Sequence, residues 1–416
     1  MSDTSRETVE AVWRIESSRI IGALARYTGD FALAEDVAQE ALAEALVSWP
    51  RDGIPSSPTG WLVSVGRRRA IDAFRRRSLR DEKYALIAQD TETTSTEELL
   101  DPDRIDDDRL ALLFIACHPV LSKESQVALT LRVVGGLGSE QIARAFLVPV
   151  PTVQARITRA KKTLAAAQVR YGVPPAQERA SRLASVLNVI YLIFTEGSNA
   201  SVGDEVLRVD LAAEATRLAR MLVRLVPGQP ESWGLLALCE LTAARFPARI
   251  GTDGDVILLA DQNRRRWDRT AIRRGTAALA KATSIGQGLG PYGLQAAIAA
   301  CHAAAPSIEE TDWEQIVILY EALGRIAPSP IVDLNRAVAI SMAHGPAAAL
   351  PIVDDLVARD VLRGSQLLPS VRGELLIRLG REQEAREELE LAARLTVNSR
   401  ERAVLEHKLA ELSHRR

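Results

Sequence analysis

Cysteine is scarce in this chain of 416 residues, which holds only three, Cys117, Cys239 and Cys301. They lie far apart and form no CxxC pair, so neither a disulfide framework nor a zinc site is indicated. Histidine is also rare, and no nucleophile motif accompanies the five that occur. We predict that the protein is not an enzyme and needs no cofactor or metal. The adjacent pairs Cys117-His118 and Cys301-His302 lie in apolar helical contexts and are interpreted as core residues.

Long apolar runs are missing as well. No stretch approaches the roughly 18 apolar residues that indicate a membrane-spanning helix. The N-terminal sequence MSDTSRETVEAVW is polar and lacks the apolar centre of a signal peptide. We therefore expect a cytoplasmic protein with no membrane contact, in keeping with its few cysteines.

Aromatic residues make up only 4 % of the chain, whereas apolar residues as a group reach 47 %. The sequence is rich in Ala, Leu, Arg and Glu, which favour helices, and alternating runs of β-branched residues are scarce. We predict an all-α fold, and the length predicts two to four domains.

Charge is balanced overall, with a net value of −2, but it is unevenly distributed. Eight basic and three acidic residues lie between positions 61 and 83, and six basic residues with no acid lie between 141 and 177. Nine acids and one arginine occupy positions 90–108 between them. Two basic patches suggest two contacts with one polyanion, although solvated helix faces would give the same pattern.

Breaks in composition divide the first part of the chain. Residues 8–80 have helical periodicity, with Asp30 placed as a helix N-cap and a Pro-, Gly- and Ser-rich loop at 50–60. Residues 81–105 are polar and acidic and predict a flexible linker. Residues 106–171 form a second helical unit.

Repeated helix pairs are predicted after a second linker at 172–177. The best-defined pair, 312–345, is 34 residues long, which is the tetratricopeptide period. We predict a tetratricopeptide-like helical array over 179–416, and an irregular helical bundle is the alternative.

A helix-turn-helix pattern occupies 139–164, with Ser139 as the expected N-cap of its first helix. In the second helix, one face is apolar and contains Val153, Ile157, Ala160 and Leu164. The remaining surface presents Thr, Gln, Arg and Lys side chains, which can hydrogen-bond base edges or neutralise phosphates. The pattern indicates a reader of the DNA major groove, although such patterns also occur in other helical proteins.

An acidic cluster lies on the helix ALAEDVAQEAL, where Asp36 and Glu40 are one turn apart. Nothing else in the sequence converges on it as a metal ligand would. An acidic and apolar face suits docking on a basic helix of a partner, and an ordinary solvated face is the alternative.

A second basic helix, GWLVSVGRRRAIDAFRRR, combines arginines with aromatic residues. This combination suits strand separation, in which unstacked bases need stacking partners and phosphates need cations. Core aromatics with surface arginines would produce the same sequence.

In this order, the three segments resemble the extracytoplasmic-function group of bacterial RNA polymerase sigma factors. AEDVAQEAL resembles the core-polymerase-binding helix of that group, and GWLVSVGRRRAIDAFRRR resembles its promoter −10 helix. LTLRVVGGLGSEQIARAFLVPVPTVQARITRAKK resembles its −35-reading domain. The segments VLNVIYLIFTEG, ILLADQNRRRWD, GPYGLQAAIAACHA and PSPIVDLNRAVAISMAHGP resemble the C-terminal extension of its large, tetratricopeptide-like members.

The resemblance implies a helical sigma-2 domain at 8–80, which binds core polymerase and the −10 element. It also implies a helix-turn-helix sigma-4 domain at 106–171, which binds the −35 element. The implied partners are promoter DNA and core RNA polymerase, through its β′ clamp helices and its β flap.

The resemblance also implies roles for individual residues. The residues implied to bind the polymerase are Glu35, Asp36, Gln39 and Glu40. The residues implied to hold −10 DNA are Arg67, Arg68, Arg75 and Arg76, with Arg68 standing where the group often has Asn. The residues implied to contact the −35 element are Thr152, Gln154, Arg156, Arg159 and Lys162.

We therefore expect a sigma factor that directs core polymerase to −10/−35 promoters. We expect residues 179–416 to regulate it, by intramolecular contact or by holding a regulatory protein. One alternative is a stand-alone transcriptional regulator that uses only the helix-turn-helix, with the array as a sensor. Another is a scaffold protein that does not bind DNA.

Overall fold

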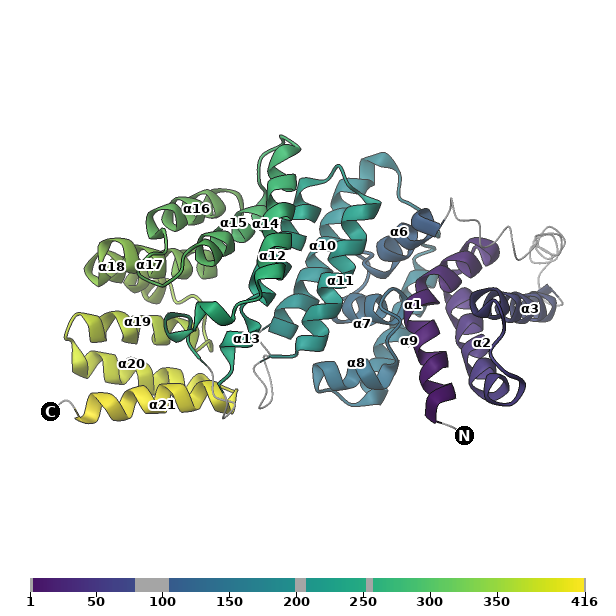
Figure 1. Ribbon diagram of the computed structural model, residues 1–416, viewed down its shortest axis with the longest axis horizontal. Coiled ribbons are helices and arrows are strands. Elements are labelled where there is room, and N and C mark those ends of the chain that lie inside the picture. The colour runs from purple at the N-terminus through teal and green to yellow at the C-terminus, as the bar shows by residue number, and fades with distance from the viewer. Residues whose placement is uncertain (1–2, 79–104, 199–206, 252–256, 415–416) are drawn as a thin grey trace. The chain divides into compact units, whose positions relative to one another are not determined.

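The computed structural model describes residues 3–78, 105–198, 207–251 and 257–414. The chain divides into two compact units, Met1–Leu192 and Ile193–Arg416 (Figure 1). The regular elements of the described residues are α-helices and short 3₁₀ helices, and no strand occurs among them, which confirms the predicted all-α fold. None of these helices combines the length and apolar character needed to cross a membrane.

Three helices open the first unit: α1 (Asp3–Thr28), α2 (Phe31–Asp52) and α3 (Pro58–Ser78). They bury Ile20, Val37 and Phe74, among other apolar side chains, in a shared core. The Asp30 side chain accepts a hydrogen bond from the Leu33 backbone N–H at 3.0 Å, as predicted for the N-cap of α2. We call these helices the three-helix part.

The loop predicted over 50–60 is shorter than expected. Helix α2 continues through Pro50 to Asp52, and α3 already begins at Pro58. The turn after Pro50 still closes, since the Gly53 backbone N–H donates to the Trp49 oxygen at 3.0 Å. Pro58 suits the first turn of α3, because the N–H that proline lacks would have no acceptor within the helix there. The connection between the two helices is therefore limited to 53–57.

The helix-turn-helix part of the first unit contains α6 (Ile105–Ala116), α7 (Lys123–Val133), α8 (Ser139–Phe146) and α9 (Val150–Ala166). The expected cap at Ser139 is wrong by one residue, since Ser139 is already helical and Gly138 is the N-cap. Leu147 ends α8 in the left-handed region, with φ of 49°, and this conformation makes the tight turn into α9.

Close contacts at two glycines join the three-helix part to the helix-turn-helix part. A Cβ atom at Gly22 of α1 would lie 2.8 Å from the Cβ atom of Asp108 on α6. A Cβ atom at Gly136, between α7 and α8, would lie 2.6 Å from the Ser17 hydroxyl oxygen. Glycine at both positions lets the two parts approach more closely than any other residue would.

Helix α10 (Ala176–Ser198) ends the first unit and begins the second. The predicted domain boundary at 179 therefore falls inside a helix. The predicted linker 81–105 lies outside the described residues except for Ile105, where α6 begins.

The second unit continues as a series of helices, most of which pack on the next helix in the chain, while α12 packs on both α14 and α15 (Figure 1). The 34-residue segment 312–345 forms the antiparallel pair α16 and α17, which agrees with the period seen in the sequence. The elements after α10 are α11 (Val209–Leu225), α12 (Pro230–Ala243), α13 (Phe246–Arg249), η2 (Leu259–Asp261), η3 (Arg264–Arg266), α14 (Arg269–Ser284), α15 (Pro291–Ala304), α16 (Trp313–Ile326), α17 (Pro330–His344), α18 (Pro346–Ala358), α19 (Leu367–Arg378), α20 (Glu382–Leu395) and α21 (Ser399–His414).

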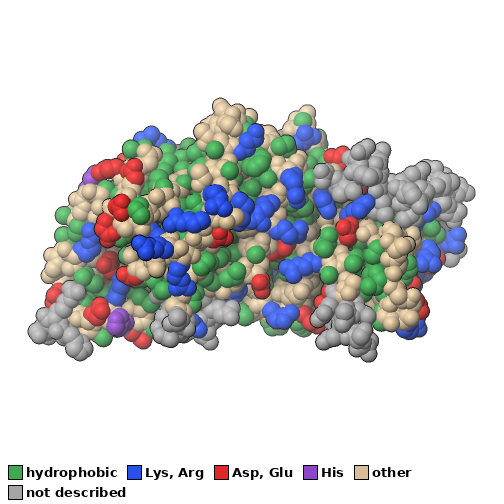
Figure 2. Space-filling view, in the orientation of Figure 1, with side chains coloured by type: hydrophobic (Ala, Val, Ile, Leu, Met, Phe, Trp, Pro, Cys, Tyr) green, Lys and Arg blue, Asp and Glu red, His purple; other side chains and the backbone are tan. Residues whose placement is uncertain are grey.

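Basic side chains gather over α11 and α12 on the face drawn in Figure 2. Buried Glu240 of α12 accounts for two arginines of this region. Its carboxylate accepts hydrogen bonds from Arg220 at 2.5 Å and from Arg274 at 2.8 Å. These arginines are about half exposed, at 44 % and 45 % of their side-chain surface, so part of the basic surface serves to hold α11 and α14 on α12.

Gly234 lies where α12 and α15 approach backbone to backbone, and it offers a test of the packing. A Cβ atom there would lie 2.6 Å from the Gly293 backbone nitrogen. We expect Gly234→Ala to destabilise the second unit by about 1–3 kcal/mol, because neither backbone can move aside. Urea unfolding followed by circular dichroism measures the change. Gly228→Ala is the control, since nothing lies within 4 Å of a Cβ atom there; equal stability of both variants would contradict the packing argument.

Candidate functional site

Helix α9 has the two faces that its sequence predicted. Its buried residues are Val153, Ile157, Ala160 and Leu164, which are the four assigned to the apolar face. The residues expected to contact the −35 element lie on the remaining surface. Of these, Gln154, Arg159 and Lys162 are exposed, and Thr152 and Arg156 are half-buried. The five are thus spread over the part of α9 that lies outside its apolar face.

Helix α3 presents three of its four predicted DNA-binding arginines to solvent, namely Arg68, Arg75 and Arg76. The fourth, Arg67, is half-buried and lies with its guanidinium carbon 5.8 Å from the centroid of the Tyr27 ring. This cation–π contact fixes Arg67 against α1. The exposed basic surface of α3 is therefore narrower than the sequence suggested.

The four residues expected to dock on the polymerase do not share one exposed face of α2. Asp36 and Glu40 are exposed and Gln39 is half-buried, whereas Glu35 retains only 2 % of its surface. The sequence predicted a solvent-facing cluster, and the structure instead places one of its carboxylates in an interface.

Buried Glu35 is paired with two cations of the helix-turn-helix part. One carboxylate oxygen lies 2.7 Å from Lys161 Nζ on α9, and the other lies 3.4 Å from Arg132 Nε on α7. Lys161 also binds the carboxylate of Asp36. A buried charge is tolerated when it is paired in this way.

The environment of Lys161 alters its pKa in two opposing directions. Burial lowers the pKa, and the carboxylates of Glu35 and Asp36 raise it by more, so that the pKa of Lys161 lies above 10.5. The lysine is therefore charged at neutral pH and acts as a cation between two carboxylates.

Arg69 of α3 neutralises a second set of carboxylates on α2. Its guanidinium lies 2.9 Å from Glu44 and 3.8 Å from Glu40. The hydrogen bond and the charge of Glu44 raise the pKa of Arg69. Arg69 thus faces α2, although its neighbour Arg68 belongs to the surface predicted to bind DNA.

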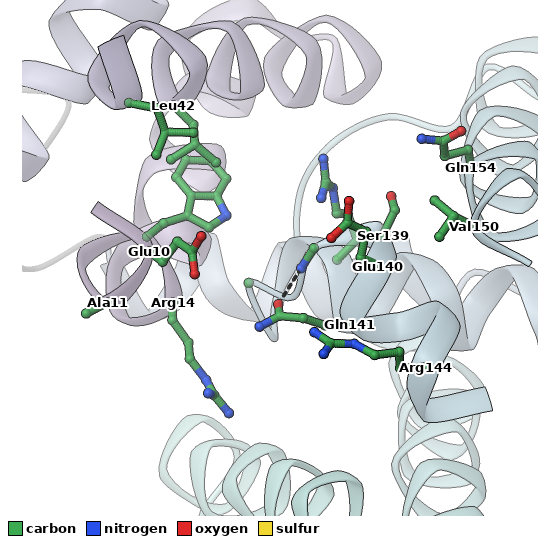
Figure 3. Close-up of a pocket in the computed structure, with 15 residues that line it drawn as sticks. Glu10, Ala11, Arg14, Leu42, Ser139, Glu140, Gln141, Arg144, Val150 and Gln154 are labelled. Atoms are coloured by element: carbon green, nitrogen blue, oxygen red, sulfur yellow. Dashed lines mark hydrogen bonds between the residues drawn. The ribbon is translucent and has the colours of Figure 1, made fainter. Parts of the chain in front are cut away.

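A cleft of about 840 Å³ lies between α1 and α2 on one side and α8 and the start of α9 on the other. Figure 3 shows Gln154 and Arg144 on one side of it, and Glu10, Arg14 and Leu42 on the other. Gln154, which is predicted to contact bases, therefore lines a cleft whose opposite wall is formed by α1 and α2.

Cys117 and Cys239 are both buried. Burial raises the pKa of the Cys117 thiol to about 12 and that of Cys239 as well, so neither forms a thiolate readily. In the part of the chain that the structure describes, no group of three or more His, Cys, Asp or Glu could hold a metal ion.

His302 differs from the expected core residue. It is half-buried, and its pKa is lowered to about 4 by burial and by the nearby cations Arg245 and Arg264. The ring packs edge-on against Trp313, with 5.2 Å between centroids. The backbone oxygen of His302 accepts a hydrogen bond from Arg264 at 2.8 Å, which fixes the end of α15.

Sequence reasoning missed Lys161 and Arg132 as partners of α2. A signal for Lys161 existed, since it follows Ile157 by four residues and therefore borders the apolar stripe of α9 rather than opposing it. Nothing comparable marked Arg132. The periodicity of a helix predicts which of its residues share a face. It does not predict which other element that face packs against.

Comparisons with known families agree with this geometry. Residues 14–80 match Sigma-70 region 2, and residues 111–164 match Sigma-70, region 4. The first match spans most of α1 to α3, and the second spans the helix-turn-helix part. Residues 182–283 match a family of unknown function, DUF6596.

Three curated proteins illustrate the similarity. The "Uncharacterized protein R00370" of Rhizobium meliloti is 46 % identical over 94 % of this chain and 93 % of its own length. The "Probable ECF RNA polymerase sigma factor SigI" of Mycobacterium tuberculosis is 29 % identical over 42 % of this chain and 61 % of its own length. The "RNA polymerase sigma-H factor" of Pseudomonas aeruginosa is 29 % identical over 35 % and 78 %.

The raised pKa of Lys161 predicts how its contact with α2 depends on pH. A lysine with a raised pKa stabilises the folded contact at every pH below its unfolded value of 10.5 and loses this effect as pH rises through the folded value. We expect the distance between fluorophores at exposed Ala43 and Ala166 to stay constant from pH 7 to about 9.5 and to increase above about 10.5. A change already complete near pH 8 would contradict this. In Lys161→Met, which carries no titrating amine, the change above pH 10.5 should be reduced.

Proposed function

The chain belongs to the extracytoplasmic-function group of RNA polymerase sigma factors and directs core polymerase to promoters, and we propose how its own residues divide that work. The match of residues 14–80 to Sigma-70 region 2 favours this function over a stand-alone regulator, which would need only the helix-turn-helix. The C-terminal unit, of which residues 182–283 match a family of unknown function, fits a large subgroup of these factors.

We assign −10 DNA to the exposed arginines of α3. Arg68, Arg75 and Arg76 would neutralise phosphates. Arg67, held on the Tyr27 ring, would present its guanidinium beside them. The single observation that carries this assignment is the division of α3 into one face that pairs with α2 through Arg69 and another that leaves Arg68 exposed.

We assign the −35 element to α9. Gln154 and Thr152 would hydrogen-bond base edges, and Arg159 and Lys162 would contact phosphates beside them. Arg156, which is half-buried, lies between the two groups. The β flap of the polymerase is the proposed partner that holds this part on the enzyme.

We assign polymerase docking to α2, with Asp36 and Glu40 as the carboxylates that a basic helix of β′ would meet first. Glu35 and Gln39 lie deeper and would complete the surface. No catalytic step is assigned to this chain, because the polymerase carries the chemistry. Its place of action is the cytoplasm, where polymerase and promoter DNA occur together.

We propose that the second unit regulates the first, either directly or by holding a regulatory protein. The support for this is its organisation as consecutive helix pairs, which in repeat proteins present long surfaces to other polypeptides. It forms a compact unit and could receive a signal without forming part of the proposed DNA-binding surface.

Adjacent arginines of α3 test the −10 assignment. For polymerase loaded with the Arg68→Ala variant, we expect weaker promoter binding and a slope of log affinity against log salt that is smaller by about 1, because one phosphate contact is lost. Promoter binding measured at several salt concentrations gives the slope. Arg69→Ala is the matched control, since Arg69 pairs with Glu44 and Glu40. Equal slopes for both variants would refute the assignment.

Removal of the second unit tests the regulatory role. The deletion should begin after Ser198, because cutting at 179 would divide α10. We expect promoter-directed run-off transcription to change several-fold, or its response to a regulatory partner to disappear. Unchanged transcription and unchanged regulation would eliminate this role. If neither the full chain nor the truncated form supports specific initiation, the residue assignments for promoter binding are wrong as well.

A further inference from the structure

Carboxylates assigned to the polymerase already have basic partners inside the first unit. Lys161 of α9 binds both Glu35 and Asp36, and Arg132 of α7 binds Glu35. Two of the four proposed docking residues are therefore occupied by cations from the helix-turn-helix part.

These pairs differ from ordinary surface ion pairs in their burial. The side chain of Glu35 is 3 % exposed, and those of Lys161 and Arg132 are 16 % and 18 % exposed. Salt screens such pairs much less than exposed ones. A cation from another protein cannot reach the Glu35 carboxylate while both partners remain in place.

The pairing is one of several contacts that hold the two parts together. Arg26 of α1 lies 3.4 Å from the carboxylate of Asp108 on α6. The hydroxyl oxygen of Tyr171, which follows α9, would lie 3.4 Å from a Cβ atom at Gly22 of α1. Together with the glycine contacts at Gly22 and Gly136, these interactions define a packed interface rather than a chance encounter of charges.

This packed arrangement cannot read both promoter elements at once. The centres of a −10 and a −35 element are separated by about 25 base pairs, or about 85 Å of straight duplex at 3.4 Å per base pair. In the structure, a side chain of the −35 helix binds a side chain of α2, which packs directly on the −10 helix α3. The helix-turn-helix part must therefore leave α2 before the promoter is bound.

We propose that the helix-turn-helix part is an intramolecular competitor of the polymerase, in which Lys161 and Arg132 occupy the docking carboxylates until a basic helix of the polymerase replaces them. The proposal identifies what that helix must supply: one cation for each oxygen of Glu35, with one of them also reaching Asp36. It rests on the proposed docking role of α2 and adds the step that regulates it.

Competition of this kind links two events. Polymerase binding removes the partners of Lys161 and Arg132, which releases α9 and opens the cleft in front of Gln154 (Figure 3). The apparent affinity for polymerase equals the affinity of the open form multiplied by the fraction of molecules that are open. The free protein keeps both its polymerase-binding and its promoter-reading surfaces partly covered.

The test uses Lys161→Met in the full chain, because methionine keeps the apolar stem that packs beside α2 and removes only the charge. Fluorophores at Ala43 and Ala166 report the separation of α2 and α9 without polymerase. Binding of labelled chain to core polymerase is measured separately. We expect a longer mean distance and at least a five-fold gain in polymerase affinity. Arg132→Met should act in the same direction, and circular dichroism confirms that each variant is folded.

Arg170→Met is the matched control, since it removes an exposed cation beyond the end of α9 and should change neither distance nor affinity. If Lys161→Met lengthens the distance but leaves polymerase affinity unchanged or weaker, the competition is refuted. If it leaves the distance unchanged, the contact does not hold the closed form and the proposal also fails. Glu40→Gln tests the docking role independently, because Glu40 pairs with Arg69 rather than with the helix-turn-helix part. Undiminished binding by that variant would refute the docking role itself.

Discussion

Glu35 is a carboxylate in an almost solvent-free position on α2, and its charge requires cations at that place. Lys161 and Arg132 supply them, and this requirement connects α2 to α7 and α9. Leaving Glu35 charged and unpaired is expensive, so a change of partner must proceed by exchange, with one set of cations replacing another. Because Glu35 is buried, it is a poor ligand for an arbitrary surface cation. Only a helix whose cations have the correct spacing can replace Lys161 and Arg132.

Helix α9 interacts with two kinds of anion through different sides. Lys161 contacts the carboxylates of α2, while Arg159 and Lys162 point to solvent and are assigned to phosphates. Successive helical residues are separated by about 100° around the axis, which allows neighbouring lysines to have different partners. The net charge of −2 does not show this arrangement, because what matters here is which positive and negative side chains lie next to each other.

Periodicity predicted the parts of the fold that one helix determines alone. The four buried residues of α9 and the N-cap Asp30 were foreseen because spacing and side-chain chemistry specify them locally. The extent of α2 was wrong, because the helix continues through Pro50 to Asp52. The surroundings of Glu35 could not be foreseen, since its partners lie 97 and 126 residues away. The boundary at 179 stays a prediction; α10 runs without interruption past it, from Ala176 to Ser198.

The glycine contacts of α1 determine how the first unit can open. At Gly22 and Gly136, the opposing atoms leave no room for a Cβ atom. Packed surfaces of this kind have a well-defined closed state and no stable partly separated one. On our proposal, the first unit has a closed and an open state, and a regulator needs only to shift the equilibrium between them. A regulator that weakens the contact at one position then increases the population of open molecules. The amount of protein that can bind polymerase rises in proportion to that population.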